Sequence, residues 1–104
     1  MKLYNKLVRD RIPEVIEASG RSCECRILEQ GEFMRCLDEK LMEELKEYHA
    51  SGEVEELADM IEVILAIASE KGTSLEELEL IRLKKKETRG GFEKRLFLIS
   101  VTNQ

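Results

Sequence analysis

Two stretches of apolar residues with helical spacing flank a short turn, Ser51-Gly52, near the middle of the 104-residue chain. Apolar side chains recur every three or four residues over 33–48 and again over 56–67, which is the period of a helix with one buried face. A connection this short predicts that the two helices fold back on each other. The sequence therefore predicts an antiparallel helical hairpin.

Four carboxylates are placed symmetrically about this turn. Glu44 and Asp59 lie equally far from its centre, and so do Glu47 and Glu56. In the hairpin Glu44 would face Asp59 and Glu47 would face Glu56, because residues three apart on a helix share a face. Carboxylates gathered in this way repel one another unless a cation lies between them. Oxygen-only ligands favour Mg²⁺, or Mn²⁺, over zinc, which usually recruits His or Cys.

The position of Glu44 supports a site, because this residue falls on the apolar stripe where a core side chain is expected. The alternative interpretation is a solvated acidic surface, since 38% of the residues are charged and most acidic pairs in such chains lie in water.

Further elements are expected on either side of the hairpin. A short helix is predicted from Pro13 to about residue 19, long helices over about 30–50 and 53–71, and a last helix that opens with a Ser74-x-x-Glu77 capping box and ends near Arg89. Alternation over 23–27 predicts a brief strand, paired with the tail 95–101. The expected fold is one mainly α domain over 1–104, an antiparallel hairpin or bundle with a small β element.

Composition limits the partners. The net charge of −5 argues against a nucleic-acid polymer or an anionic membrane as partner. No apolar run approaches the 18 residues of a membrane span, and the first residues lack the apolar core of a signal peptide. Three cysteines make an odd number, which predicts reduced thiols. A cytoplasmic location is therefore expected.

Basic residues form a second candidate site. Lys85 and Arg89 end the last predicted helix and precede Gly90-Gly91-Phe92, while Lys6 and Arg9 lie near the N-terminus. Cations at a helix C-terminus also complement its dipole, which accounts for the first group without a ligand. The functional interpretation is a phosphate site. Together with the acidic cluster it predicts a phosphorylated substrate, because Mg²⁺ is commonly shared between carboxylates and phosphate oxygens.

The order of these motifs resembles a known family. Glu43-Glu44-x-x-Glu47 followed by Glu56-x-x-Asp59 resembles the metal motif of the MazG-like all-α nucleoside triphosphate pyrophosphohydrolases, which are related to the phosphoribosyl-ATP pyrophosphohydrolases. The segments 4–13 and 89–92 resemble the opening and closing motifs of a small stand-alone branch, so the resemblance covers nearly the whole chain. One departure is that only eight residues separate Glu47 from Glu56, fewer than in larger MazG proteins.

The resemblance implies magnesium-dependent hydrolysis between the α and β phosphates, which yields a nucleoside monophosphate and pyrophosphate. Removal of non-canonical nucleotides, control of deoxynucleotide pools and a biosynthetic step on phosphoribosyl-ATP are all compatible with this chemistry. It implies that the metal ligands are Glu44, Glu47, Glu56 and Asp59. Glu43 or Glu47 would orient the attacking water. Substrate phosphates would be bound by Lys85 and Arg89, and we add Lys6 and Arg9 to the expected substrate-binding residues.

The sequence also predicts that the chain assembles with further copies, and it leaves an alternative function open. The apolar character of residues 60–68 on almost every side predicts contact with another subunit, and the resemblance implies dimers or tetramers, with sites completed across subunits. The alternative function is a non-catalytic oligomeric module that senses a metal or regulates a partner. It predicts metal binding or assembly without turnover.

Overall fold

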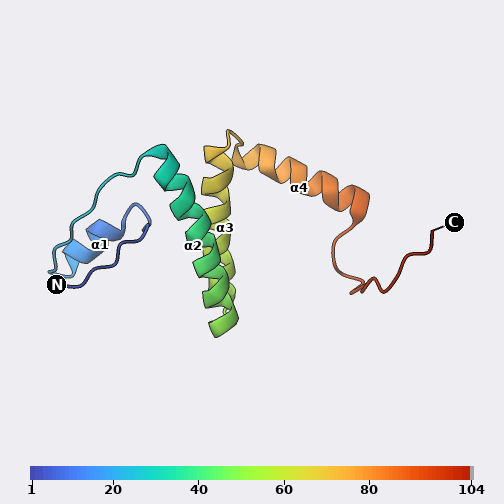
Figure 1. Ribbon diagram of the computed structural model, residues 1–104, viewed down its shortest axis with the longest axis horizontal. Helices are drawn as coiled ribbons and strands as arrows, with labels where there is room; N and C mark the ends of the chain where they lie inside the picture. The colour runs from blue at the N-terminus through green and yellow to red at the C-terminus, as the bar shows by residue number, and fades with distance from the viewer. Residues whose placement is uncertain (104) are drawn as a thin grey trace.

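The computed structural model describes residues 1–103, and within them it contains four α-helices (Figure 1): α1 Ile12–Ala18, α2 Gln30–Ser51, α3 Val54–Glu70 and α4 Leu75–Arg89. Each lies close to its predicted range, so the mainly α class is confirmed. The predicted capping box opens α4, where the Glu77 N–H donates to Ser74 Oγ at 3.1 Å and the Ser74 N–H donates to Glu77 Oε1 at 3.3 Å.

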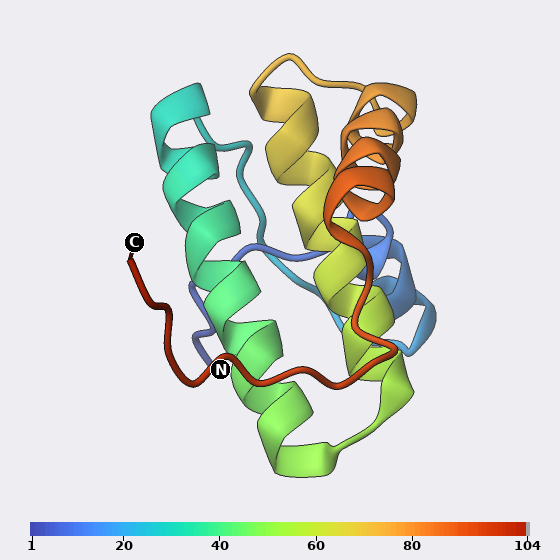
Figure 2. The same ribbon diagram turned by 90° about the vertical axis from the view of Figure 1, so that its right-hand side faces the viewer.

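The hairpin of α2 and α3 is the centre of the fold. The two helices lie side by side in Figures 1 and 2 and run in opposite directions. Gly52 ends α2 with φ of 69°, and its N–H donates to the Tyr48 carbonyl at 2.7 Å. Glycine adopts this left-handed conformation without the steric cost that a Cβ brings. The reversal is complete within a few residues, which aligns the two acidic motifs.

Few side chains are fully buried. The buried apolar residues among those described are Leu37, Val63 and Ala68, with relative exposures of 3%, 8% and 9%, and Glu44 is buried with them at 5%. They belong to α2 and α3, whereas α1 and α4 have no buried residue. The hairpin is therefore the packed part of the chain.

The molecule is elongated, with extents of 66 × 32 × 22 Å and a radius of gyration of 18.6 Å, compared with about 13 Å for a compact domain of this length. Figure 1 shows the cause, because α4 runs away from the hairpin and α1 stands apart on the other side. The exposed surface is 9823 Å², whereas a compact monomer of 12.0 kDa exposes about 6,000 Å². A large part of the surface that folding normally covers is therefore in water.

The predicted β element is absent from residues 1–103. Residues 23–27 and 95–101 belong to no strand, and Figure 1 shows them at opposite ends of the long axis. A strand requires a neighbour for its backbone hydrogen bonds, and here the two segments are too far apart to pair. The prediction of an intramolecular strand pair was wrong because a pattern of alternating residues does not specify which partner is within reach.

No helix in the described part of the chain combines the length and the apolar character needed to cross a bilayer.

Candidate metal centre

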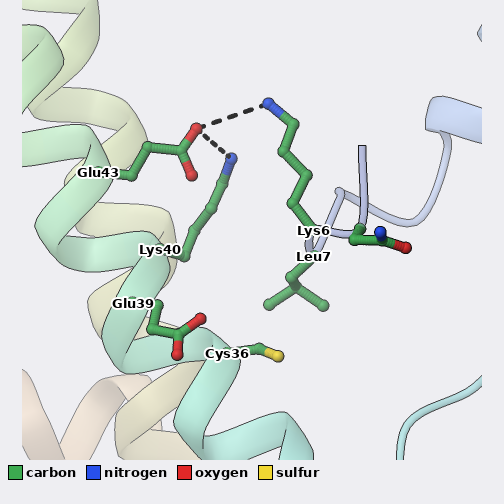
Figure 3. Close-up of a pocket in the computed structure, with 7 residues that line it drawn as sticks. Lys6, Leu7, Cys36, Glu39, Lys40 and Glu43 are labelled. Carbon is green, nitrogen blue, oxygen red and sulfur yellow. Dashed lines mark ion pairs between the residues drawn. The ribbon is translucent and has the colours of Figure 1, made fainter. Parts of the chain in front are cut away.

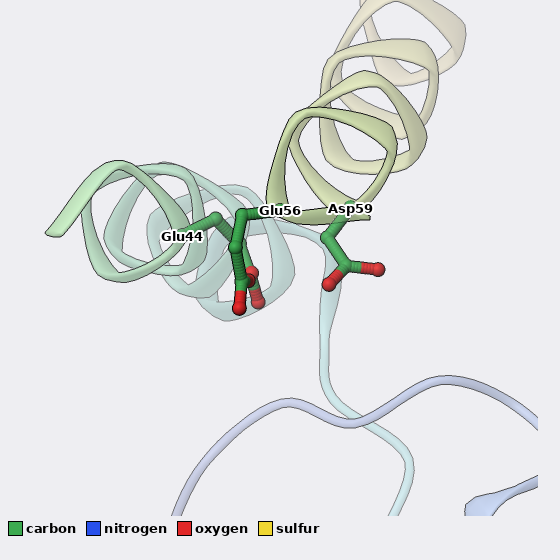
Figure 4. A group of neighbouring side chains, drawn as sticks. All are labelled: Glu44, Glu56 and Asp59. Carbon is green, nitrogen blue, oxygen red and sulfur yellow. The ribbon is translucent and has the colours of Figure 1, made fainter. Parts of the chain in front are cut away.

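Three carboxylates converge near the turn of the hairpin. Glu44 extends from α2, and Glu56 and Asp59 extend from α3 (Figure 4). One oxygen of each carboxylate lies within 4.8 Å of the others. Oxygens on opposite sides of an octahedral magnesium ion are about 4.2 Å apart, twice the usual bond length. Small side-chain rotations would therefore bring all three oxygens within bonding distance of one ion.

Glu44 is the least exposed member of this cluster. Its Oε1 lies 3.3 Å from Lys40 Nζ, whereas its Oε2 is buried and accepts no hydrogen bond from the described residues. Burial raises the pKa of Glu44, and the neighbouring Glu47 raises it further, while Lys40 opposes the shift. A buried oxygen without a donor is unfavourable. A cation bound at this oxygen would remove that cost, so the donor set and its surroundings fit a hard divalent ion.

Glu47, the fourth predicted ligand, lies at the edge of the cluster. Its side chain is exposed and close enough to Glu44 to share a hydrogen bond when one of the two is protonated, but it is outside the group of three converging carboxylates. Glu47 therefore borders the cluster and remains in contact with solvent.

The N-terminal segment crosses the acidic face of the hairpin. Arg9 Nη2 lies 2.7 Å from Asp59 Oδ1, and Lys6 Nζ lies 3.5 Å from Glu43 Oε1. Figure 3 shows Lys6 reaching toward Glu43 from this segment. Residues fifty positions apart in the sequence are thus brought together. Arg9 therefore contacts a member of the carboxylate cluster, whereas Lys6 pairs with Glu43, which lies outside the three converging carboxylates.

Lys40 is a member of the site that the sequence motifs did not single out. Its ammonium lies 3.8 Å from Glu43 Oε1 as well as near Glu44, because residues three and four positions apart on a helix are neighbours. That spacing was the available signal. Lys40 also lines a cavity of about 50 Å³ between α2 and the N-terminal segment; this volume holds a few waters and is too small for a nucleotide.

The predicted phosphate residues Lys85 and Arg89 are not brought to the cluster within one chain. They line an open groove at the far end of α4, formed by Arg82, Lys85, Lys86 and residues 89–93. Figure 1 shows that α4 leaves α3 at the end of the hairpin opposite the turn, so its last residues point away from the carboxylates. An anion bound in this groove would not contact the acidic cluster of the same chain.

An "Uncharacterized protein" of Mycolicibacterium smegmatis is 52% identical over 46 residues, which are 44% of this chain and 47% of that protein. The match thus spans about half the length of the curated relative. No family model matches the chain. No solved structure matches it either. The interpretation of the site therefore depends on its own geometry.

Proposed function

We propose that the chain is a magnesium-dependent nucleoside triphosphate pyrophosphohydrolase that cleaves between the α and β phosphates. The observation that carries this proposal is the convergence of Glu44, Glu56 and Asp59 within 4.8 Å, together with the unpartnered buried oxygen of Glu44. The resemblance of the acidic and flanking motifs to the MazG-like group supports the same reaction. Mn²⁺ is an alternative metal, and non-canonical nucleotides are candidate substrates in a cytoplasmic setting.

Each residue of the site has a separate role in the proposed reaction. Glu44, Glu56 and Asp59 would hold the cation, which when bound would neutralise charge on the triphosphate and lower the pKa of a water. Glu47 is exposed beside Glu44 and accepts the proton from the attacking water. Arg9 lies at the rim, where it can exchange its contact with Asp59 for a phosphate oxygen of the substrate. Glu43 keeps Lys6 close to the same rim.

Assembly is part of this proposal. The apolar side chains of Val54, Leu57, Ile61 and Ile64 follow one another at spacings of three, four and three residues along α3, and they are 76%, 39%, 56% and 38% exposed. Such a stripe is typical of a helix that packs against another helix. A second copy of the chain would cover it. Because Lys85 and Arg89 point away from the cluster in one chain, their role in phosphate binding requires another copy.

The test is pyrophosphate release from canonical and modified nucleoside triphosphates, measured with magnesium and with chelator. We expect magnesium-dependent release of pyrophosphate with a nucleoside monophosphate as co-product. Glu56→Gln and Asp59→Asn should each reduce turnover at least 100-fold, whereas Glu55→Gln, an exposed neighbour on the same helix, should retain it. Full activity of both cluster variants would contradict the site.

The alternative is a non-catalytic module that binds metal through the same cluster. The buried oxygen of Glu44 supports metal binding for either function, so metal affinity alone does not separate them. Absence of turnover across the substrate panel, with folding and manganese binding intact, would favour this module.

A further inference from the structure

The last residues of the described chain are apolar and lie in water. After Gly90-Gly91 the backbone leaves α4, and residues 96–101, here named the apolar tail, lie outside every helix and strand. The relative exposures of Leu96, Phe97, Leu98, Ile99 and Val101 are 86%, 89%, 77%, 89% and 76%. An extended backbone that combines unpaired hydrogen-bonding groups with large apolar side chains readily pairs with another strand.

A second segment has complementary properties. Residues 23–27, here named the thiol segment, connect α1 to α2 outside any helix or strand. Alternate side chains of a strand share a face, so in a paired strand Cys23, Cys25 and Ile27 would lie on one side and Glu24 and Arg26 on the other. Ile27 is 97% exposed. This segment lies at the end of the molecule opposite to the apolar tail (Figure 1).

We propose that the apolar tail of one chain pairs as an antiparallel strand with the thiol segment of a second copy, and that the exchange is reciprocal. Each chain carries both partners of the pair, so two copies related by a twofold axis satisfy both segments at once. None of the carboxylates of the cluster takes part in this interface, so the pairing can be tested separately from hydrolysis.

The register follows from side-chain chemistry. Aligning Phe97 with Ile27 in an antiparallel pair places Ile99 opposite Cys25 and Val101 opposite Cys23, so the β-favouring side chains face one another. The same register brings Arg95, which precedes the apolar tail, near Glu29. With Phe97 on Ile27, a parallel arrangement would instead place Ile99 opposite Glu29 and Val101 opposite Gly31, and with Phe97 on Cys23 it would place Arg95 opposite Arg21. Charge and apolar matching therefore select the same antiparallel alignment.

The large exposed surface area of the chain supports a second copy as the binding partner of these segments. The chain exposes about 3,800 Å² more than a compact monomer of its mass, and obligate homodimers commonly bury about 1,000–2,500 Å² on each partner. The area that the exchanged segments and the adjoining surfaces would bury on each chain is therefore smaller than this extra exposed area.

The experiment is disulfide trapping between two differently tagged full-length chains. One chain carries Ile99→Cys with its three natural cysteines replaced by Ser. The other keeps Cys25 and carries Cys23→Ser and Cys36→Ser. After mixing and mild oxidation with diamide we expect a covalent heterodimer, formed at least tenfold faster than with Leu98→Cys, whose side chain points to the opposite face of the strand. Equal rates for the two variants would overturn the register.

A second measurement tests the exchange itself. The double variant Phe97→Asp and Ile99→Asp in the full chain should lower the molar mass in light scattering, or weaken association at least tenfold in sedimentation. Its helix content should not change, because the apolar tail packs on no helix of its own chain. An unchanged association constant would overturn the proposal. A chain that carries both Cys25 and Ile99→Cys and forms its disulfide as a monomer would also overturn it.

Discussion

Replacing Glu44 with Gln should stabilise the metal-free protein. Glu44 is 5% exposed and has one oxygen without a donor, and an unsatisfied buried acceptor costs about 1–3 kcal/mol, more when it is charged. The amide keeps the shape and an acceptor for Lys40 but removes the charge and adds a donor toward the neighbouring carboxylates. We expect the free energy of unfolding to rise by about 1–2 kcal/mol, which raises Tm by about 5–10 °C in a chain of this size.

The assay is thermal and urea unfolding at pH 7 in chelator, followed by helical circular dichroism. Asp38→Asn is the matched control, because it removes one negative charge from an exposed position of the same helix and should change stability by less than about 0.5 kcal/mol. With magnesium at a hundred times its Kd the wild type gains about 2.7 kcal/mol and the order of stability should reverse. A Glu44→Gln chain that is less stable than wild type in chelator would refute the reasoning.

The pH dependence in chelator gives an independent check of the same group. Because the pKa of Glu44 is raised in the folded chain, the native state binds more protons than the unfolded state at pH values between the unfolded carboxyl pKa, about 4.3, and the raised value. The free energy of unfolding contributed by this group therefore falls as pH rises through that interval and is constant above it. The Glu44→Gln variant should lack this pH dependence of the free energy of unfolding. If the variant keeps the same dependence, other carboxyl groups cause it.

Three further perturbations probe other parts of the molecule. Lys40→Met removes the cation beside Glu44 and should lower the free energy of unfolding in chelator by about 1–3 kcal/mol, measured by urea unfolding. An unchanged free energy would mean that the cost of desolvating the two charges offsets the attraction in this ion pair. Ser74→Ala removes the oxygen that accepts from the Glu77 N–H and should cost about 1 kcal/mol, read as lost helical signal on heating, with Ser74→Asp as the variant that restores the cap. Partial loss of hydration and a hydrogen bond with Cys25 raise the pKa of the exposed Cys23 thiol. Iodoacetamide at pH 7 should therefore alkylate Cys23 more slowly than the uncharged reference N-acetylcysteine amide, as followed by mass spectrometry, and faster reaction would contradict the shift.

The helices could be predicted from the sequence because their signals are local. Apolar spacing, the Ser74-x-x-Glu77 cap and the glycine after Ser51 each act within a few residues, and all four helices lie close to the predicted ranges. The convergence of Glu44 with Asp59 was also predictable, because a two-residue turn transmits the register of one helix to the other.

Features that depend on distant contacts were not predictable in the same way. The ion pair of Arg9 with Asp59 links residues fifty positions apart, and no local pattern specifies how the N-terminal segment crosses the hairpin. The direction of α4 depends on the backbone conformation near Gly72, which no local sequence pattern specifies. The distance between Lys85 and the carboxylates therefore could not be inferred from the sequence. The predicted strand over 23–27 is absent for a related reason, because its predicted partner lies at the other end of the molecule.

The short connection at Gly52 also bears on the order in which the chain folds. The buried side chains of residues 1–103 belong to the two helices joined by that turn, so the core closes through contacts within one helical hairpin. Folds built from such local contacts have low contact order and cross a small loop-closure barrier, which makes them fast. Hairpin closure is then a first-order event that is independent of protein concentration. The three carboxylates are consequently assembled at the earliest stage, before the two ends of the chain have found a surface on which to pack.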